Sequence, residues 1–121
     1  MEIENIKFKA KQLNSGKWFE GDLVRLGNRV CIGGDHIKDG ITDVDPSTVC
    51  MFTGLKDCEG KELFEHDLIH FVGFTHTAEV IWSEGNYAFM VVSENKPLYL
   101  LPHVLEIGKI ERVGNKFDKK K

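Results

Sequence analysis

The sequence lacks any hydrophobic run long enough to cross a membrane as a helix. In this chain of 121 residues the longest apolar stretches, such as residues 88–92, are short. A spanning helix needs roughly 20 apolar residues. Residues 1–5 also lack the basic and apolar segments of a signal peptide. We therefore expect a soluble, cytoplasmic protein with no membrane partner.

Cysteine and proline are both scarce. The three cysteines, Cys31, Cys50 and Cys58, are odd in number, which argues against a disulfide framework and for a reducing compartment. Cys50 and Cys58 are also too widely spaced for a zinc knuckle of the two-residue kind. The 3 prolines accompany 12 glycines and a hydrophobic content of 41%, a balance typical of a turn-rich β protein.

The common catalytic motifs are missing as well. The sequence has no phosphate-cradling glycine-rich motif, no Gly-x-Ser-x-Gly elbow and no dinucleotide fingerprint. His66 and His70 lie in an expected strand, where four residues span roughly 13 Å, too far for both to reach one zinc ion. The carboxylate pairs at 20/22 and 65/67 stand at turn-to-strand junctions, where an Asp caps the backbone. We predict no enzymatic activity, no metal and no cofactor.

Positive charge is concentrated at the carboxyl end. The net charge is −3, and residues 116–121 contribute four lysines and one aspartate, which leaves −6 on the remainder. An acidic body is a poor sequence-independent binder of nucleic acid, because that mode needs clustered Lys and Arg. A nucleic-acid-binding accessory protein therefore stays the alternative function. It would use the basic tail and the lysines of the first expected strand: Lys7, Lys9 and Lys11.

The first third of the chain predicts a three-stranded β-meander. Apolar residues at 6, 8 and 10 alternate with lysines at 7, 9 and 11, which indicates a half-exposed strand with a basic outer face. A turn at 14–16 precedes a second strand over 18–26, and Gly27-Asn28 makes a short hairpin turn into a third strand over 29–32. The polar, glycine-rich connection over 33–46 is then a hinge, a functional loop or partly strand-like.

The rest of the chain reads as short strands separated by turn residues. We expect strands over 48–53, 68–72, 77–82, 87–92 and 98–101, a single 3₁₀ turn over 102–105, and a last strand over 106–113. Many short strands at regular spacing indicate a small closed or nearly closed barrel. Residues 16–24 and 60–69 share a Gly-Lys and a later Phe-Glu-x-Asp-Leu, for which we favour reuse of one turn-to-strand solution over a duplication.

One segment in the middle of the chain carries a specific motif. Asp57-Cys58-Glu59-Gly60 is a turn, since Asp bonds the backbone ahead of it and Gly tolerates a positive φ. Asp67 is placed to cap a tight turn that leads into the next strand. The run resembles the signature of the YopX-like family of phage and prophage proteins. The residues that carry the signature are Thr53, Gly54, Leu55, Asp57, Gly60, Glu65 and Asp67.

The resemblance extends over nearly the whole chain. The opening segment of the family is similar to residues 8–10 and 16–23. A later strand of the family is similar to residues 78–82, and its closing strand to residues 106–110. The chain departs from the pattern at Cys50-Met51, at Lys109 and at His66, which stands where Gly is usual and puts a positive φ in doubt. The resemblance implies a protein of unknown function in a bacterial host cell, with an SH3-like barrel in its C-terminal part.

We therefore predict a mostly all-β protein with a small SH3-like β-barrel and an N-terminal β-meander extension. The expected divisions are a meander and connection over 1–44, the barrel over 45–113, and a disordered basic tail over 114–121. The favoured function is a non-catalytic protein-binding or assembly module whose protein partner is unknown. Lys7, Lys9, Lys11 and Trp18 form the candidate binding surface.

Two aromatic-rich strands bear on the partners. Residues 77–82 and 87–92 are apolar on both faces, and such strands are covered on both sides. The cover is either the N-terminal meander or another subunit, so we expect a homo-oligomer. The aromatic residues would serve a nucleic-acid stacking platform or, as we favour, core packing. They are Trp18, Phe19, Trp82, Tyr87, Phe89 and Tyr99.

Overall fold

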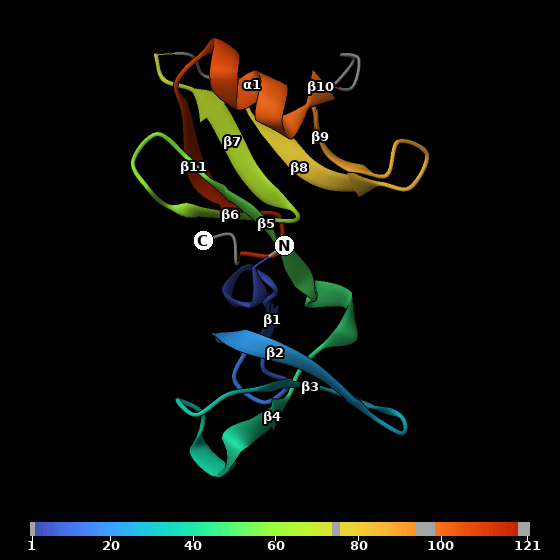
Figure 1. Ribbon diagram of the computed structural model, residues 1–121. Helices are drawn as coiled ribbons and strands as arrows, with labels where there is room; N and C mark the ends of the chain where they lie inside the picture. The colour runs from blue at the N-terminus through green and yellow to red at the C-terminus, as the bar shows by residue number, and fades with distance from the viewer. Residues whose placement is uncertain (1, 74–75, 94–98, 119–121) are drawn as a thin grey trace. The chain divides into compact units, whose positions relative to one another are not determined.

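The computed structural model describes residues 2–73, 76–93 and 99–118 and confirms a mostly β protein (Figure 1). The chain divides into two compact units, Met1–Phe52 and Thr53–Lys121. The strands form two antiparallel sheets with the orders β4-β3-β2-β1-β5-β6 and β10-β9-β8-β7-β11. The predicted division after residue 44 stays a prediction.

The first unit contains the expected meander. Its strands are β1 (Phe8–Lys11), β2 (Trp18–Leu26) and β3 (Arg29–Gly33). Gly27, at φ 58°, turns β2 into β3, because a residue without a Cβ adopts the left-handed conformation at little cost. Short 3₁₀ turns, η1 (Ile3–Asn5) and η3 (Pro46–Thr48), precede β1 and β5 (Cys50–Lys56). The core of this unit is Ala10, Ile32, Ile37 and Val44.

The connection over 33–46 is partly strand-like, which was one of the three interpretations. It contains a 3₁₀ turn, η2 (Lys38–Gly40), and strand β4 (Ile41–Asp43), which pairs with β3. Ile37 and Val44 are 6% and 1% exposed. Residues 41–43 of this polar segment are therefore paired in a sheet, and the side chains of Ile37 and Val44 belong to the core.

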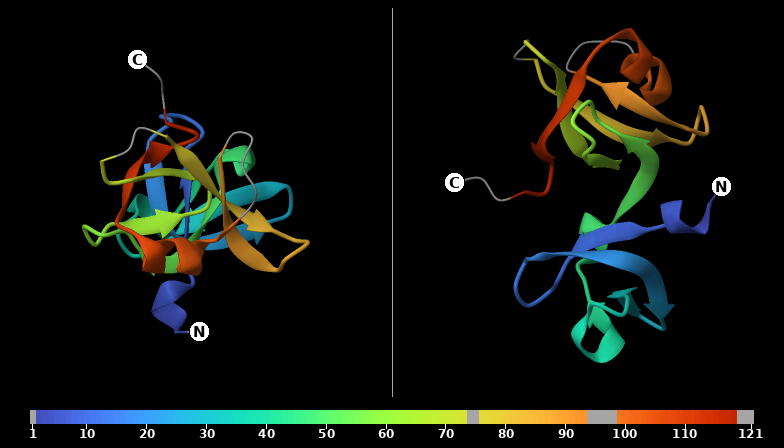
Figure 2. Two further views of the ribbon diagram at one scale, coloured as in Figure 1. Left: turned by 90° about the horizontal axis from the view of Figure 1, so that it is seen from above. Right: turned by 60° about the vertical axis from the view of Figure 1, so that its left-hand side comes forward.

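The second unit is built on a meander that the last strand completes. The strands are β6 (Glu62–Phe64), β7 (Asp67–Phe71), β8 (Ala78–Ser83), β9 (Ala88–Val92), β10 (Tyr99–Leu100) and β11 (Ile110–Asn115). Strands β7, β8 and β9 follow one another, and β11 returns to pair with β7. Helix α1 (Leu101–Ile107) leads from β10 toward β11 (Figure 2). Its Leu101 and Val104 are buried in a core with Leu63, Ile69, Val80, Val91 and Ile110.

Four expectations about the elements need correction. We predicted a closed or nearly closed barrel, and the closed form is absent from the described ranges, where the strands form two antiparallel sheets. The predicted 3₁₀ turn is a seven-residue α-helix, because Leu101 and Val104 follow helical spacing and are both buried. The last strand begins four residues later than expected, at Ile110. The strand expected over 98–101 is only Tyr99–Leu100, and Leu98 lies outside the described residues.

A fifth correction concerns the tail. Gly114 and Asn115 belong to β11, and Lys116 donates its backbone N–H to the carbonyl of His66 over 2.9 Å. The Phe117 N–H donates to Asn115 Oδ1 over 2.9 Å. Residues 114–118 are thus attached to the second unit rather than disordered. Residues 119–121, with three of the tail lysines, lie outside the described residues.

Candidate functional site

Asp57 of the signature is a structural residue that joins a turn to the last strand. Its Oδ1 accepts hydrogen bonds from the backbone N–H groups of Glu59 and Lys61, at 2.9 and 2.8 Å. Its Oδ2 accepts from the N–H of Arg112, 55 residues away, at 2.8 Å. Burial of Asp57 opposes ionisation, but the backbone hydrogen bonds from Arg112, Lys61 and Glu59 outweigh it. They hold the pKa of the Asp57 carboxyl below its ordinary value.

Asp67 confirms the predicted capping role and also reaches the last strand. The side chain is fully buried, and its Oδ2 accepts the N–H of Phe64 over 2.7 Å. The same oxygen lies 3.1 Å from Arg112 Nε, and Oδ1 accepts from Asn115 Nδ2 over 2.9 Å. A buried carboxylate is stable when each oxygen has such partners. Both aspartates of the signature therefore converge on Arg112.

The other signature residues shape the β5–β6 hairpin. Thr53 Oγ1 donates to the Leu63 carbonyl over 2.7 Å and accepts the N–H of Leu55 at 3.1 Å. Gly54 and Gly60 each have a φ of 83°, which favours glycine. Leu55 packs against the core, and the Glu65 carbonyl accepts from Asn115 Nδ2 at 3.4 Å. The signature thus specifies the scaffold of the second unit.

His66 keeps the positive φ that its replacement of Gly had put in doubt. Its φ is 70°, and its backbone N–H donates to the carbonyl of Val80 over 2.6 Å. Nδ1 lies 2.8 Å from Glu79 Oε2, and the ring contacts Phe117 edge-on, with centroids 5.2 Å apart. These contacts hold a histidine in a conformation that costs a non-glycine residue about 1 kcal/mol.

The lysines of the candidate binding surface are engaged within the first unit. Lys7 Nζ lies 3.2 Å from Glu20 Oε1. Lys9 Nζ and Lys11 Nζ lie over the ring of Trp18, at 4.7 and 5.5 Å from its centroid. Lys9 is only 9% exposed, so the predicted basic outer face is wrong at its central residue. Alternation along a strand does not reveal an aromatic residue on the neighbouring strand, and here Lys11 pairs with Trp18.

The histidines and the surface cysteine belong to no metal-holding group in the part of the chain that the structure describes. The structure shows no group of three or more His, Cys, Asp or Glu side chains that could hold a metal ion within the described ranges. The ring of His70 pairs with Glu111, as that of His66 does with Glu79. Cys58 is exposed, whereas Cys31 and Cys50 are buried.

Sequence reasoning missed a small polar cluster in the first unit. The Cys31 thiol donates to Asp43 Oδ1 at 3.0 Å, and Arg29 Nε donates to the same oxygen at 2.9 Å. Burial, together with the hydrogen bond and charge of Asp43, raises the pKa of the Cys31 thiol. A thiol with a raised pKa is a poor nucleophile at neutral pH. The cluster joins β3 to β4.

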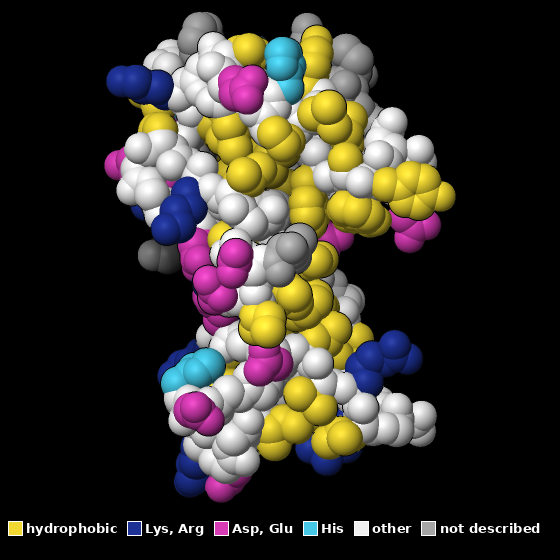
Figure 3. All heavy atoms as spheres, viewed as in Figure 1, with side chains coloured by type: hydrophobic (Ala, Val, Ile, Leu, Met, Phe, Trp, Pro, Cys, Tyr) yellow, Lys and Arg dark blue, Asp and Glu magenta, His cyan; other side chains and the backbone are white. Residues whose placement is uncertain are grey.

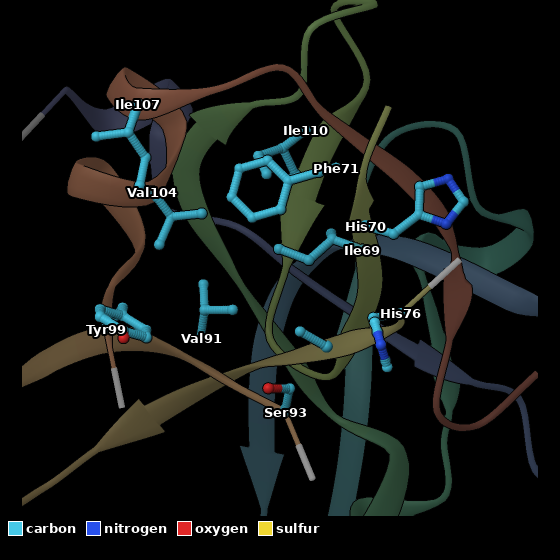
Figure 4. Close-up of a pocket in the computed structure, with 11 residues that line it drawn as sticks. Ile69, His70, Phe71, His76, Val91, Ser93, Tyr99, Val104, Ile107 and Ile110 are labelled. Carbon is cyan, nitrogen blue, oxygen red and sulfur yellow. The ribbon is translucent and has the colours of Figure 1, made fainter. Parts of the chain in front are cut away.

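An apolar pocket in the second unit is the best candidate site, and sequence reasoning missed it too. It has a volume of about 350 Å³ and lies between α1 and the strands β7, β8, β9, β10 and β11 (Figure 4). The residues that line it are Ile69, His70, Phe71, His76, Ala78, Val91, Ser93, Tyr99, Val104, Ile107 and Ile110. The sequence signal was present, because β8 and β9 are apolar on both faces.

The rim of this pocket is exposed and hydrophobic. Phe71, Tyr99 and Ile107 are 37%, 50% and 62% exposed. Hydrophobic side chains gather on the face of the second unit that carries α1, β8 and β9 (Figure 3). Singly exposed apolar residues are ordinary, but several around one hollow mark an interaction site. The rim extends the apolar surface beyond the pocket itself.

The chemistry of the lining selects for a neutral occupant. Its polar side chains are His70, His76 and Ser93, and no Lys, Arg, Asp or Glu among the described residues lines it. His70 is engaged by Glu111, whereas the side chains of Ser93 and His76 lie toward one edge of the pocket (Figure 4). The interior would therefore accept an apolar or aromatic group that directs one hydrogen-bonding atom to that edge.

Comparison with known proteins assigns the chain to a family. A family model described as "YopX protein" matches residues 3–120. No curated protein matches the chain. Among the described residues, no helix has the length and apolar character needed to span a membrane.

Proposed function

The chain belongs to the YopX family, and from this premise we propose that it is a non-catalytic binding or assembly module whose binding site is the apolar pocket of the second unit. The observation that carries the proposal is the hydrophobic rim around that pocket: Phe71, Tyr99 and Ile107. A free small molecule needs only an enclosed hollow. An apolar rim favours a protein partner that inserts one side chain and covers the rim.

The size of the pocket supports a side-chain occupant. Ligand pockets have volumes of about 300 to 1,000 Å³, so this pocket, at about 350 Å³, is at the small end of that range. Water molecules in it meet mostly carbon. Their displacement by an apolar group would contribute about 25 cal/mol for each Å² of apolar surface removed from water.

The SH3-like part of the prediction belongs to this proposal. The meander β7-β8-β9, a short helix, and a last strand that returns to β7 support an SH3-like order of elements without a closed barrel. The family resemblance supports a phage or prophage context and a bacterial cytoplasm. The surface formed by Lys7, Lys9, Lys11 and Trp18 is not proposed as the site, because its lysines are engaged by Glu20 and Trp18.

The test is a pull-down of tagged protein from bacterial lysate, with and without nuclease, read by mass spectrometry. Ile107→Glu places a charge on the rim of the pocket, and Val113→Glu is the matched control, since Val113 is 49% exposed and outside the lining. We expect a protein that the wild type and Val113→Glu retain and Ile107→Glu loses. Equal capture by both variants would contradict the pocket as the site, and recovery only without nuclease would favour nucleic acid.

A further inference from the structure

We propose that the occupant of the pocket is Tyr87 of a second copy of this chain, so that copies of the chain self-associate. This inference rests on the proposed function, because it names the partner of that same pocket. Three features carry it: the exposure and backbone conformation of Tyr87, the chemical match of a phenol to the pocket, and the position of Tyr87 outside the pocket of its own copy.

Tyr87 projects from the turn between β8 and β9. It is 82% exposed, more than any other aromatic residue that the structure describes. Its φ is 49°, in the left-handed region that a bulky residue rarely adopts. An exposed aromatic residue in such a conformation costs stability on both counts, and strain of this kind concentrates at functional sites. Binding of the exposed ring by another molecule would offset this cost.

The phenol matches the pocket group by group. The ring would contact carbon atoms of Val91, Val104 and Phe71, which line the hollow. A buried phenol hydroxyl needs a hydrogen-bond partner, and Ser93 and His76 lie toward one edge (Figure 4). The phenol is neutral, which suits an interior whose described lining has no Lys, Arg, Asp or Glu.

The surroundings of Tyr87 match the rim. Trp82 is 41% exposed and contacts Phe89 edge to face, with ring centroids 5.1 Å apart. This aromatic pair lies next to the turn and would cover the exposed side chains of the rim. Glu84 in the same turn meets no carboxylate in the described lining, and the neighbouring Glu111 is engaged by His70.

Tyr87 does not fill the pocket of its own copy, since it is 82% exposed. The lining residues Ala78 and Val91 lie five and three residues along β8 and β9 from the pair Ser83 and Ala88, which closes the hairpin next to Tyr87. Those stretches of strand are about 17 and 10 Å long. The contact would therefore join two molecules, either reciprocally in a twofold dimer or from copy to copy in a ring or a filament.

Sedimentation velocity from micromolar to near-millimolar concentration tests this inference. We expect the wild-type mass to rise to that of a dimer or beyond, and Tyr87→Ala and Ile107→Glu each to remain monomeric. Tyr87→Phe keeps the ring and loses one hydrogen bond, so its self-association should weaken by roughly two- to tenfold. Circular dichroism and thermal melting establish that each variant is folded.

Mixing the two monomeric variants gives the decisive result. Tyr87→Ala keeps its pocket and Ile107→Glu keeps its tyrosine, so an equimolar mixture should form a dimer and stop there. A wild type that stays monomeric, or a mixture that does, overturns the inference. If the wild type is monomeric but Ile107→Glu still loses a captured protein in the pull-down, self-docking fails and the proposed function stands.

Discussion

Arg112 is the residue at which the two aspartates of the signature meet. Asp57 accepts its backbone N–H, and Asp67 lies 3.1 Å from its side-chain Nε. The sequence predicted that both aspartates cap turns: Asp57 because Asp at the start of a turn bonds the backbone ahead of it, and Asp67 because it stands between a tight turn and the next strand. It did not predict Arg112, which lies more than forty residues along the chain from either of them. Local turn chemistry is readable from neighbouring residues, whereas a partner across a sheet depends on register.

Asp57→Asn should destabilise the protein, and more so at neutral than at acid pH. Loss of charge-assisted hydrogen bonds to three backbone N–H groups should cost about 1–3 kcal/mol. The folded pKa of Asp57 lies below its ordinary value, so its contribution is present above the ordinary carboxyl pKa of about 3.9. It is lost as the pH falls from there through the folded pKa.

Urea titrations at neutral pH and near pH 3 would measure this difference. Asp35→Asn is the matched control, because Asp35 is an exposed carboxylate outside the network. If Asp57→Asn is as stable as the control at neutral pH, the hydrogen bonds of the Asp57 carboxylate to the turn and to β11 add nothing to the free energy of unfolding.

The backbone at His66 allows a separation of strain from side-chain contact. His66→Ala loses the contacts to Glu79 and Phe117 and keeps a Cβ at a φ of 70°, whereas His66→Gly loses the same contacts and the strain. The glycine variant should therefore be the more stable of the two by about 1 kcal/mol. Thermal melting of both variants would check the order, and equal stability would argue against strain.

At the scale of elements, the chain uses one sequence pattern in two different conformations. In the motif shared by residues 16–24 and 60–69, Gly16 and Gly60 both have a positive φ, at 69° and 83°, and each precedes a strand, β2 or β6. Reuse of one turn-to-strand solution is therefore confirmed at the Gly-Lys step. The later Phe-Glu-x-Asp part differs, since it continues strand β2 in the first unit and turns between β6 and β7 in the second. Gly21 corresponds to His66, yet Gly21 has no positive φ and is required for another reason. A Cβ on it would lie 2.2 Å from the Gly33 carbonyl oxygen.

Gly21→Ala should disrupt the β2–β3 pairing. The obstructing atom is backbone and cannot rotate away, so the strands must separate locally at a cost of about 1–3 kcal/mol or more. Gly85→Ala is the matched control, because a Cβ on Gly85 would meet no described atom within 4 Å and its φ is not positive. Denaturant titration should show a large loss for the first variant and none for the second.

Element positions were more predictable than their environments. The strand expected over 87–92 appears as β9 within one residue, because turn residues mark its ends. The helix was underestimated, since Pro102 indicated a start but not the burial of Val104 that extends it. The pocket lies where α1 packs over five strands. The hydrophobic pattern of a single strand does not predict how a helix packs over several strands.

At the scale of the whole molecule, the described residues form two hydrophobic cores rather than one. Ile32 belongs to the core of the first unit and Val80 to that of the second. Strand β5 contributes residues to both units, pairing with β1 through its first residues. The sequence suggested a single small barrel with an extension, since its strand pattern does not show how the apolar residues divide between the two cores.

Separate cores predict separate responses to substitution. Ile32→Ala should cost about 2–5 kcal/mol in the first unit and raise amide exchange mainly over residues 8–33. Val80→Ala should raise exchange mainly over β7, β8 and β9. Hydrogen exchange measured by mass spectrometry would compare the two variants. A uniform rise over the chain in both would mean that the units unfold as one.

The joining of Asp57 and Asp67 to the last strand has a consequence for synthesis. A ribosome makes the chain from its amino end, and the residues that form β1 to β4 are complete by Asp43. The buried carboxylates of the second unit gain Arg112 and Asn115 only when synthesis has passed these two residues. A nascent chain that stalls between Lys56 and Arg112 would therefore carry all the strands of the first unit and a second unit still open to proteases.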